Sequence, residues 1–339
     1  LQSVEEQGAQ GDAEEEEAVD EQARPSALPK VFRFMRIALG GEEADGLAGG
    51  LPRTLRGMIP IRYVEPVFRP PSEAESLILP VTDGCSWNEC TFCEMYTAPQ
   101  KKFRARDESE VLESIRLTGE RYGDQVRRIF LADGDATVLP TRRLLAILEA
   151  IRSHLPAVRR VSSYCLPRNL RKKSQQEIDE LAAAGLSMVY VGAESGDDEV
   201  LAAVNKGETF ETTREALDKL GAAGITRSVM ILNGLGGKVH SRQHADNSAR
   251  LANATQPEYL ATLVVSFPMG EQRFRAGFPE WEPLSQHELF VETEQLLSAL
   301  ELKRTVFRSD HASNYLVLKG TLGADKARLL AQVRQAIEA

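Results

Sequence analysis

The sequence predicts an α/β protein whose core is a partial (β/α)6, TIM-like barrel of parallel strands, followed by a C-terminal helical extension. From about residue 76, six short apolar segments alternate with segments of helical periodicity. A helix between two strands is the crossover that parallel neighbours require. Polar and glycine-rich residues follow the strands repeatedly, and in a barrel these strand ends share one mouth. A flat doubly wound sheet is the alternative.

The predicted strands are short apolar runs bounded by turn residues. They are Ser76–Thr82, Arg127–Asp133, Arg159–Cys165, Met188–Ser195, Ser228–Gly234 and Leu260–Phe267. The predicted helices carry apolar residues at helical spacing. They cover Glu108–Tyr122, Thr141–Leu155, Ser174–Gly185, Asp197–Val204, Phe210–Gly224 and Arg242–Ala254. Ser174 should cap its helix with Glu177 at the capping-box position, and Gly185 should end it.

Charge divides the chain unevenly. The net charge is −9, but residues 1–22 alone contain nine acidic residues and no basic one, so the remainder carries no net charge. We predict four regions: a disordered acidic tail (1–28), a lead-in that packs on the main domain (29–75), the barrel core (76–283) and a C-terminal extension (284–339). The extension reads as mainly helical with one distinctive loop.

Composition excludes some protein classes. No apolar run approaches the length of a membrane span, and no signal-peptide pattern is present. Four cysteines, three of them close together, favour the cytoplasm or another reducing compartment over a disulfide-stabilised secreted protein. We therefore expect no membrane partner, while nucleic acid is not excluded.

The three clustered cysteines are the most informative motif. Cys85, Cys90 and Cys93 have the spacing C-x4-C-x2-C. Three thiolates can hold three irons of a cubic [4Fe–4S] cluster and leave the fourth iron without a protein ligand, which suggests chemistry at that iron. A structural zinc site would need a further cysteine pair or nearby histidines. Cys165 is the only other cysteine, so zinc is the less favoured alternative.

The cysteine loop after the first strand, together with motifs after later strands, resembles the radical S-adenosylmethionine (SAM) superfamily over roughly residues 77–330. The usual spacing there is C-x3-C-x2-C, and this chain has one extra residue, as some branches do. The resemblance implies that SAM chelates the open iron of a single [4Fe–4S] cluster. It implies reductive cleavage of SAM to a 5′-deoxyadenosyl radical that abstracts hydrogen from substrate. It also implies an electron donor such as flavodoxin or ferredoxin.

The resemblance further implies which residues contact SAM. Phe92 matches the aromatic position beside the adenine, and Glu194 with Ser195 matches the residues that contact the ribose. Two glycine-containing segments match those near the SAM amino group and near the adenine or methionine; they are Asp133, Gly134, Asp135, Ala136 and, after the fifth strand, Asn233, Gly234. The structural alternatives are ordinary turns for the two glycine-containing segments and a helix N-cap for Ser195 or Asp197.

Substrate determinants are less distinct. Lys102 and Arg104 lie in the basic run Lys101–Arg106, which could bind phosphate, carboxylates or RNA, or could be a solvated charge run. Three residues in the C-terminal loop are candidates for catalysis, since a histidine there could relay protons; they are Asp310, His311 and Asn314. Loop capping and packing is the alternative for all three. Cys165 reads as a buried, inert thiol.

The sequence therefore predicts a radical SAM enzyme of unspecified substrate. The absence of a second cysteine cluster disfavours the branches that carry auxiliary clusters. Three alternatives stay open: a non-catalytic Fe–S or zinc-binding scaffold, a barrel that uses SAM for methyl transfer without radical chemistry, and an oxygen-independent coproporphyrinogen oxidase-like enzyme.

Overall fold

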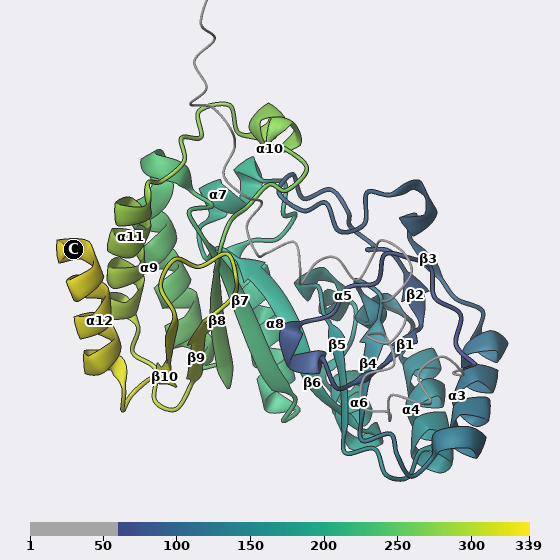
Figure 1. Ribbon diagram of the computed structural model, residues 1–339. Helices are drawn as coiled ribbons and strands as arrows, with labels where there is room; N and C mark the ends of the chain where they lie inside the picture. The colour runs from purple at the N-terminus through teal and green to yellow at the C-terminus, as the bar shows by residue number, and fades with distance from the viewer. Residues whose placement is uncertain (1–59) are drawn as a thin grey trace, which may run out of the picture.

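The computed structural model describes residues 60–339, and its centre is one open, eight-stranded sheet (Figure 1). The strands follow one another in the order β1 (Leu77–Pro80), β4 (Arg128–Ala132), β5 (Arg160–Tyr164), β6 (Leu186–Glu194), β7 (Thr226–Asn233), β8 (Tyr259–Val264), β9 (Val306–Ser309) and β10 (Leu318–Thr321). Neighbours from β1 to β9 are parallel, and only β10 is antiparallel to its neighbour. A separate two-stranded ribbon joins β2 (Thr82–Asp83) to β3 (Arg104–Ala105).

This strand order confirms the predicted partial barrel. In a doubly wound sheet the order reverses at a switch point, whereas here each strand is added on the same side of the last. The C-terminal region 284–339 contains two long helices, as predicted, and also two strands that the sequence did not predict: β9 continues the parallel sheet and β10 pairs with β9. Both strands have only four residues, too few to produce a clear alternating pattern.

Helices cover the outer face of the sheet, and the short α10 lies beyond the carboxyl ends of the strands (Figure 1). The helices of the described residues are α3 (Glu108–Tyr122), α4 (Thr141–His154), α5 (Pro167–Arg171), α6 (Gln175–Ala184), α7 (Asp198–Ala203), α8 (Phe210–Ala222), α9 (Gly237–Thr255), α10 (Gln272–Gly277), α11 (Gln286–Ala299) and α12 (Lys326–Glu338). Short 3-10 turns occur at η2 (Pro71–Glu73), η3 (Pro99–Lys101) and η4 (Ala136–Val138). The predicted capping box of Ser174 and Glu177 is present, and Gly185 ends α6 with φ 118°.

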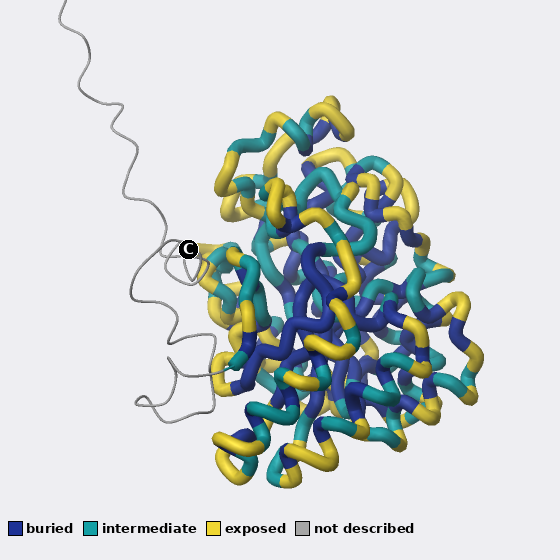
Figure 2. The backbone as a smooth tube through the Cα atoms, turned by 90° about the vertical axis from the view of Figure 1, so that its right-hand side faces the viewer, coloured by how far each residue is buried: buried dark blue, intermediate teal, exposed yellow. Residues whose placement is uncertain are grey.

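Side chains alternate between the two faces of the sheet, as strand geometry requires. Ile129 and Leu131 of β4 point into the large core beneath the helices, while Phe130 points to the concave face with Tyr164 and Tyr190. Figure 2 shows the buried strands at the centre of the molecule with exposed loops around them.

The segment directly before β1 covers part of the concave face. Tyr63 donates a 2.9 Å hydrogen bond to the carbonyl of Ile78. The Tyr190 hydroxyl donates to Glu73 at 2.6 Å. The predicted acidic tail and the lead-in up to residue 59 lie outside the described residues. Within residues 60–339, no helix combines the length and apolar character that a membrane span needs.

Candidate active site

The three clustered cysteines lie in the loop that follows β1 and β2, at the carboxyl end of the sheet. Backbone N–H groups of Trp87 and Asn88 bond to Cys85, and that of Met95 bonds to Cys93. Cys85 and Cys90 are close enough to Cys93 that their negative charge, when they are ionised, raises the pKa of Cys93. Burial raises the pKa of all three thiols, to about 12 for Cys93. These thiols therefore stay protonated unless a metal cation binds the sulfur and displaces the proton.

This arrangement fits the thiolate ligands of an iron–sulfur cluster. Such ligands are normally sulfurs that accept backbone hydrogen bonds in a partly buried loop, because these bonds tune the cluster. In a cubic cluster each thiolate binds a different iron, so the sulfurs need not converge on one point. Among residues 60–339, no group of three histidine, cysteine or acidic side chains is placed to hold a single metal ion.

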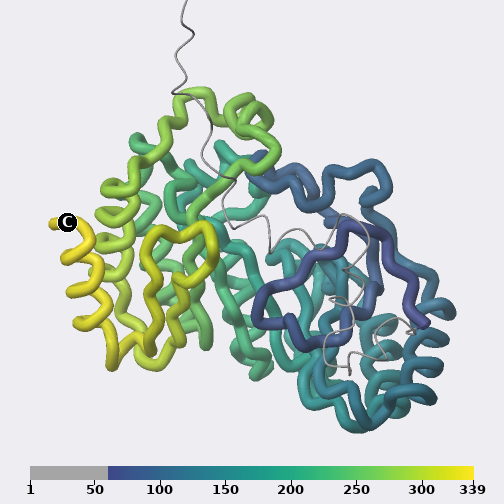
Figure 3. Tube along the Cα trace, in the orientation of Figure 1, coloured from purple at the N-terminus to yellow at the C-terminus, as the bar shows by residue number. Residues whose placement is uncertain are grey.

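Distant parts of the chain hold the cysteine loop in place. The N–H of Thr91 bonds to the carbonyl of Val204 at 3.0 Å, and Trp87 Nε1 bonds to that of Asn205 at 2.8 Å. Arg273 of α10 donates to the carbonyls of Cys93 (2.7 Å) and Asn88 (3.1 Å). Figure 3 shows the segment around α10 (green) next to this loop (blue). The loop is therefore fastened on two sides.

The two aromatic residues of the loop have different surroundings. The Arg168 guanidinium lies 3.6 Å above the ring of Trp87. Phe92 packs against an apolar cluster at the mouth of the sheet; its buried members are Val200, Val204, Leu235, Phe274, Phe278 and Trp281. Phe92 thus links the cysteine loop to the ends of β6, β7 and β8.

The segment after β4 lies directly against the first cysteine. An added Cβ at Gly134 would approach the Tyr96 ring to 2.7 Å and the Cys85 Cβ to 3.1 Å, so only glycine fits. Asp133 Oδ2 accepts from the Gly84 N–H at 3.1 Å and pairs with the buried Lys101. Asp133 Oδ1 is buried and makes no hydrogen bond to any described residue.

Asp135 joins the cysteine loop to α5. It accepts hydrogen bonds from Ser86 and from Asn169, and it is fully buried. Burial raises the pKa of Asp135 to about 6, although the bond from Ser86 opposes the shift. Ala136, the last residue of this predicted segment, begins the η4 turn.

Glu194 forms a buried ion pair that the sequence did not reveal. Lys206 Nζ lies 3.0 Å from Glu194 Oε1, and 5.8 Å from the centre of the Phe92 ring. Glu194 has φ 64°, in the left-handed region, and its carboxylate folds back over Gly192. Burial would lower the pKa of Lys206, but Glu194 and Cys90 outweigh it and raise that pKa. The pair thus stands beside the cysteine loop.

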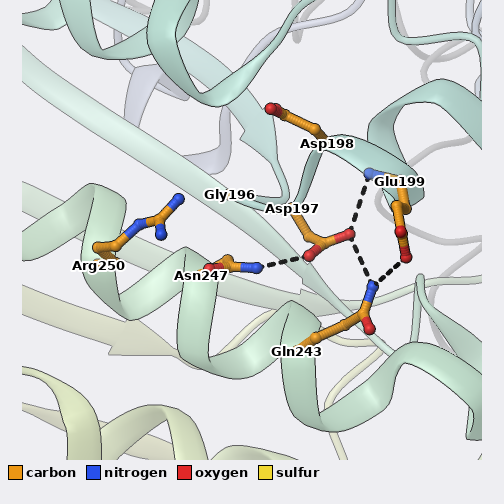
Figure 4. Close-up of a pocket in the computed structure, with 7 residues that line it drawn as sticks. All are labelled: Gly196, Asp197, Asp198, Glu199, Gln243, Asn247 and Arg250. Atoms are coloured by element: carbon orange, nitrogen blue, oxygen red, sulfur yellow. Dashed lines mark hydrogen bonds between the residues drawn. The ribbon is translucent and has the colours of Figure 1, made fainter.

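Ser195 and Asp197 turn toward the helices instead. Ser195 Oγ lies 2.8 Å from His244 Nδ1 and accepts from the Asp197 N–H at 3.0 Å. Asp197 caps α7 by accepting from the N–H groups of Glu199 and Val200, which confirms the N-cap interpretation for Asp197. A pocket of about 300 Å³ lies here. Figure 4 shows that Gln243 and Asn247 of α9 donate to the Asp197 carboxylate in it.

The glycine segment after β7 is held by α11. Asn233 Nδ2 donates to Thr293 at 3.1 Å, and the Gly234 N–H donates to Glu292 at 2.6 Å. Trp281 donates to the Gly234 carbonyl at 3.1 Å, and Gly234 has φ 81°. The side chain of Asn233 therefore points into the helix layer, and the backbone N–H and carbonyl of Gly234 are bonded to Glu292 and Trp281.

The C-terminal loop closes the far edge of the sheet. Asn314 accepts from the Val264 N–H at 2.9 Å and donates to the Thr262 carbonyl at 2.8 Å, so it caps the end of β8. Asp310 pairs with Lys319 at 2.7 Å. His311 Nδ1 accepts the N–H of Ser313 at 3.2 Å. These contacts match the loop-capping interpretation, and the catalytic assignment of the three residues stays a prediction.

Three other predicted residues lie apart from these contacts. Arg104 pairs with Asp83 at 2.7 Å. Lys102 and Arg104 line a second pocket on the side of the lead-in segment, of about 660 Å³. Cys165 is buried, and burial raises its pKa to about 12.

Comparison with known proteins gives one family match. The family model for the radical SAM superfamily matches residues 79–252, just over half of the 339-residue chain. No curated protein matches the sequence. Coproporphyrinogen III oxidase (HemN) from Escherichia coli, a radical SAM enzyme, has a TM-score of 0.50 and 16% identity, over 77% of this chain and 56% of that chain.

A second solved structure is the radical SAM methyltransferase TsrM from Kitasatospora setae, with cobalamin and a [4Fe-4S] cluster bound. Its TM-score is 0.46 and its identity 20%, over 55% of this chain and 33% of TsrM. This chain thus spans about a third of the length of TsrM. The likeness to HemN shows the fold alone, but the family model covers the cysteine loop and four of the parallel strands that follow it. The chain belongs to the radical SAM superfamily of enzymes.

Proposed function

We propose that this enzyme binds one [4Fe–4S] cluster through Cys85, Cys90 and Cys93 and cleaves SAM reductively, so that a 5′-deoxyadenosyl radical abstracts hydrogen from a substrate. The observation that carries the proposal is the placement of the three-cysteine loop at the carboxyl end of the sheet, beside Phe92 and the Lys206–Glu194 pair. When bound, the cluster supplies the electron that breaks the sulfonium C–S bond. The other residues of the site bind and orient SAM.

Asp133 and Asp135 are the groups suited to the SAM ammonium. Asp133 Oδ1 is a buried acceptor without a hydrogen bond among the described residues, and a buried acceptor normally has a partner. The ammonium would supply one. Gly134 lets this segment approach Cys85 closely, so the ammonium would be held next to the cysteine loop.

Glu194 is suited to the ribose hydroxyls. Lys206 holds one of its oxygens at 3.0 Å and fixes its orientation, and the second oxygen can accept from a hydroxyl. Phe92 offers an apolar ring for the adenine, and the backbone of Gly234 lies at the same end of the sheet. Ser195 and Asn233 face the helix layer, so we assign them a supporting role.

An external protein must supply the electron, and we propose a flavodoxin or ferredoxin. All four cysteines are free, as a reducing compartment such as the cytoplasm requires.

The test is anaerobic reconstitution, followed by iron and sulfide analysis and by product analysis after addition of dithionite and SAM. We expect about four irons per chain and formation of 5′-deoxyadenosine. Cys93→Ala should lose both, while Cys165→Ala, the matched control outside the loop, should keep both. Iron without SAM binding would favour the scaffold, and S-adenosylhomocysteine as the product would favour methyl transfer.

A further inference from the structure

Two cationic side chains lie next to each other on the concave face of the sheet, near its mouth. Arg308 of β9 is opposite Ala261 of β8 on one side and Lys319 of β10 on the other. Phe307, the neighbour of Arg308, is buried under the helices. Successive residues of a strand point to opposite faces, so Arg308 and Lys319 point to the concave side. Both are exposed.

Arg308 forms no ion pair with a carboxylate among the described residues. Three buried cations at this end of the sheet are paired with acids; the pairs are Lys101–Asp133, Arg106–Asp83 and Lys206–Glu194. The hydrogen bond of Arg308 goes to the carbonyl of Phe307, at 3.3 Å. Lys319 shares Asp310 at 2.7 Å. The two cations therefore face one acid.

An apolar floor connects this cationic pair with the cysteine loop. Met230 and Leu232 of β7 lie next to Ala261 and Leu263 of β8 on the concave face, and all four are half-buried. Leu232 packs against the same apolar cluster as Phe92. Strands are spaced about 4.8 Å apart, so Arg308 stands about 10 Å from β7 across this floor.

We propose that the substrate is an organic anion, whose apolar body lies on this floor and whose carboxylate or phosphate group binds Arg308 with help from Lys319. The inference rests on the proposed function, because it places the substrate at the mouth where SAM would be cleaved. Arginine suits the role because its planar guanidinium binds carboxylates and phosphates in a bidentate manner. The charge balance of the pair favours an anion over a neutral or cationic ligand.

The experiment compares four probes with the same apolar chain and different head groups: hexanoate, hexyl phosphate, 1-hexanol and hexylammonium. Their binding to the reconstituted enzyme with SAM is measured anaerobically by titration calorimetry. We expect the two anions to bind at least about tenfold more tightly than the other two. Arg308→Gln should weaken the anions about tenfold or more and leave hexanol unchanged. Lys319→Gln should weaken them less.

Arg127→Gln is the matched control, because Arg127 is also exposed but lies just before β4, at the opposite end of the sheet. It should bind all four probes as the wild type does. Unchanged iron content and melting temperature show that the Arg308 variant is folded. Equal binding of hexanoate to the wild type and to Arg308→Gln overturns the inference, and so does similar binding, or no binding, of all four probes.

Two further outcomes distinguish the anion site from the proposed function and from binding of the acidic tail. If the wild type forms no 5′-deoxyadenosine but binds anions through Arg308, the proposed function fails and the anion site stands.

The acidic tail is the competing occupant, since residues 14–17 are four consecutive glutamates. Full-length protein with these four changed to glutamine should bind hexanoate unchanged; a several-fold gain in affinity would assign the cations to the tail instead.

Discussion

Replacing Lys206 by methionine should destabilise the protein strongly. The side chains of Lys206 and Glu194 are only 5% and 11% exposed, and their ion pair measures 3.0 Å. Methionine has a similar length but cannot neutralise Glu194, so a buried carboxylate would lose its partner. Breaking a buried ion pair from one side costs about 3–5 kcal/mol. We expect the free energy of unfolding to fall by about that amount.

Urea unfolding of the cluster-free chain, kept reduced, measures this loss without interference from iron. Lys238→Met is the control: its pair with Glu288 spans 3.6 Å, with side chains 48% and 39% exposed, and should contribute less than about 1 kcal/mol. Adding Glu194→Gln to the Lys206 variant removes the orphaned charge and should restore part of the stability, as a double-mutant cycle would report. A loss no larger than the control's would refute the assignment of a tightly coupled buried pair.

Three further changes give separate readouts. Gly134→Ala forces a methyl group against Tyr96 and Cys85, so it should cost about 1–3 kcal/mol in urea unfolding and lower the iron bound per chain; unchanged iron content would contradict this. Ser174→Ala removes the cap of α6 and should cost about 1 kcal/mol while iron content stays the same. Burial lowers the pKa of His311 below its ordinary 6.5, against the opposing charge of Asp310. The unfolded chain therefore binds a proton more readily than the folded one, and stability should drop as pH falls below about 6.5. His311→Gln should flatten that part of the pH–melting curve, and parallel curves would contradict the assignment.

The regular part of the fold could be predicted from the sequence because its signals are local. Six apolar runs and their helical crossovers have clear periods, and Ser174, Glu177 and Gly185 carry the chemistry of a helix start and end. β9 and β10 escaped prediction because each has four residues and gains its order by pairing with β8 and with each other. Short strands depend on their neighbours more than on their own composition.

Within the candidate site, spacing predicted the cysteines but not the residues that support their loop. Lys206 reads in sequence as an ordinary surface lysine, and only the fold buries it against Glu194. Glu292 and Trp281 hold Gly234 from a helix and a loop that lie about 50 residues further along the chain. In the sequence, Asn314 is one of three candidate catalytic residues of the C-terminal loop, yet its hydrogen bonds to β8 give it a capping role. Long-range contacts of this kind have no local pattern.

The bonds from Arg273 to the cysteine loop also set an order of events during biosynthesis. Cys93 and Arg273 are 180 positions apart, so the ribosome releases the thiols long before the side chain that pins their loop. A nascent chain that has reached only β7 contains Val204 and Asn205 but not Arg273, so one of the two sets of bonds that hold the cysteine loop is still missing. The C-terminal third of the chain therefore completes the support of a loop that lies in the first third.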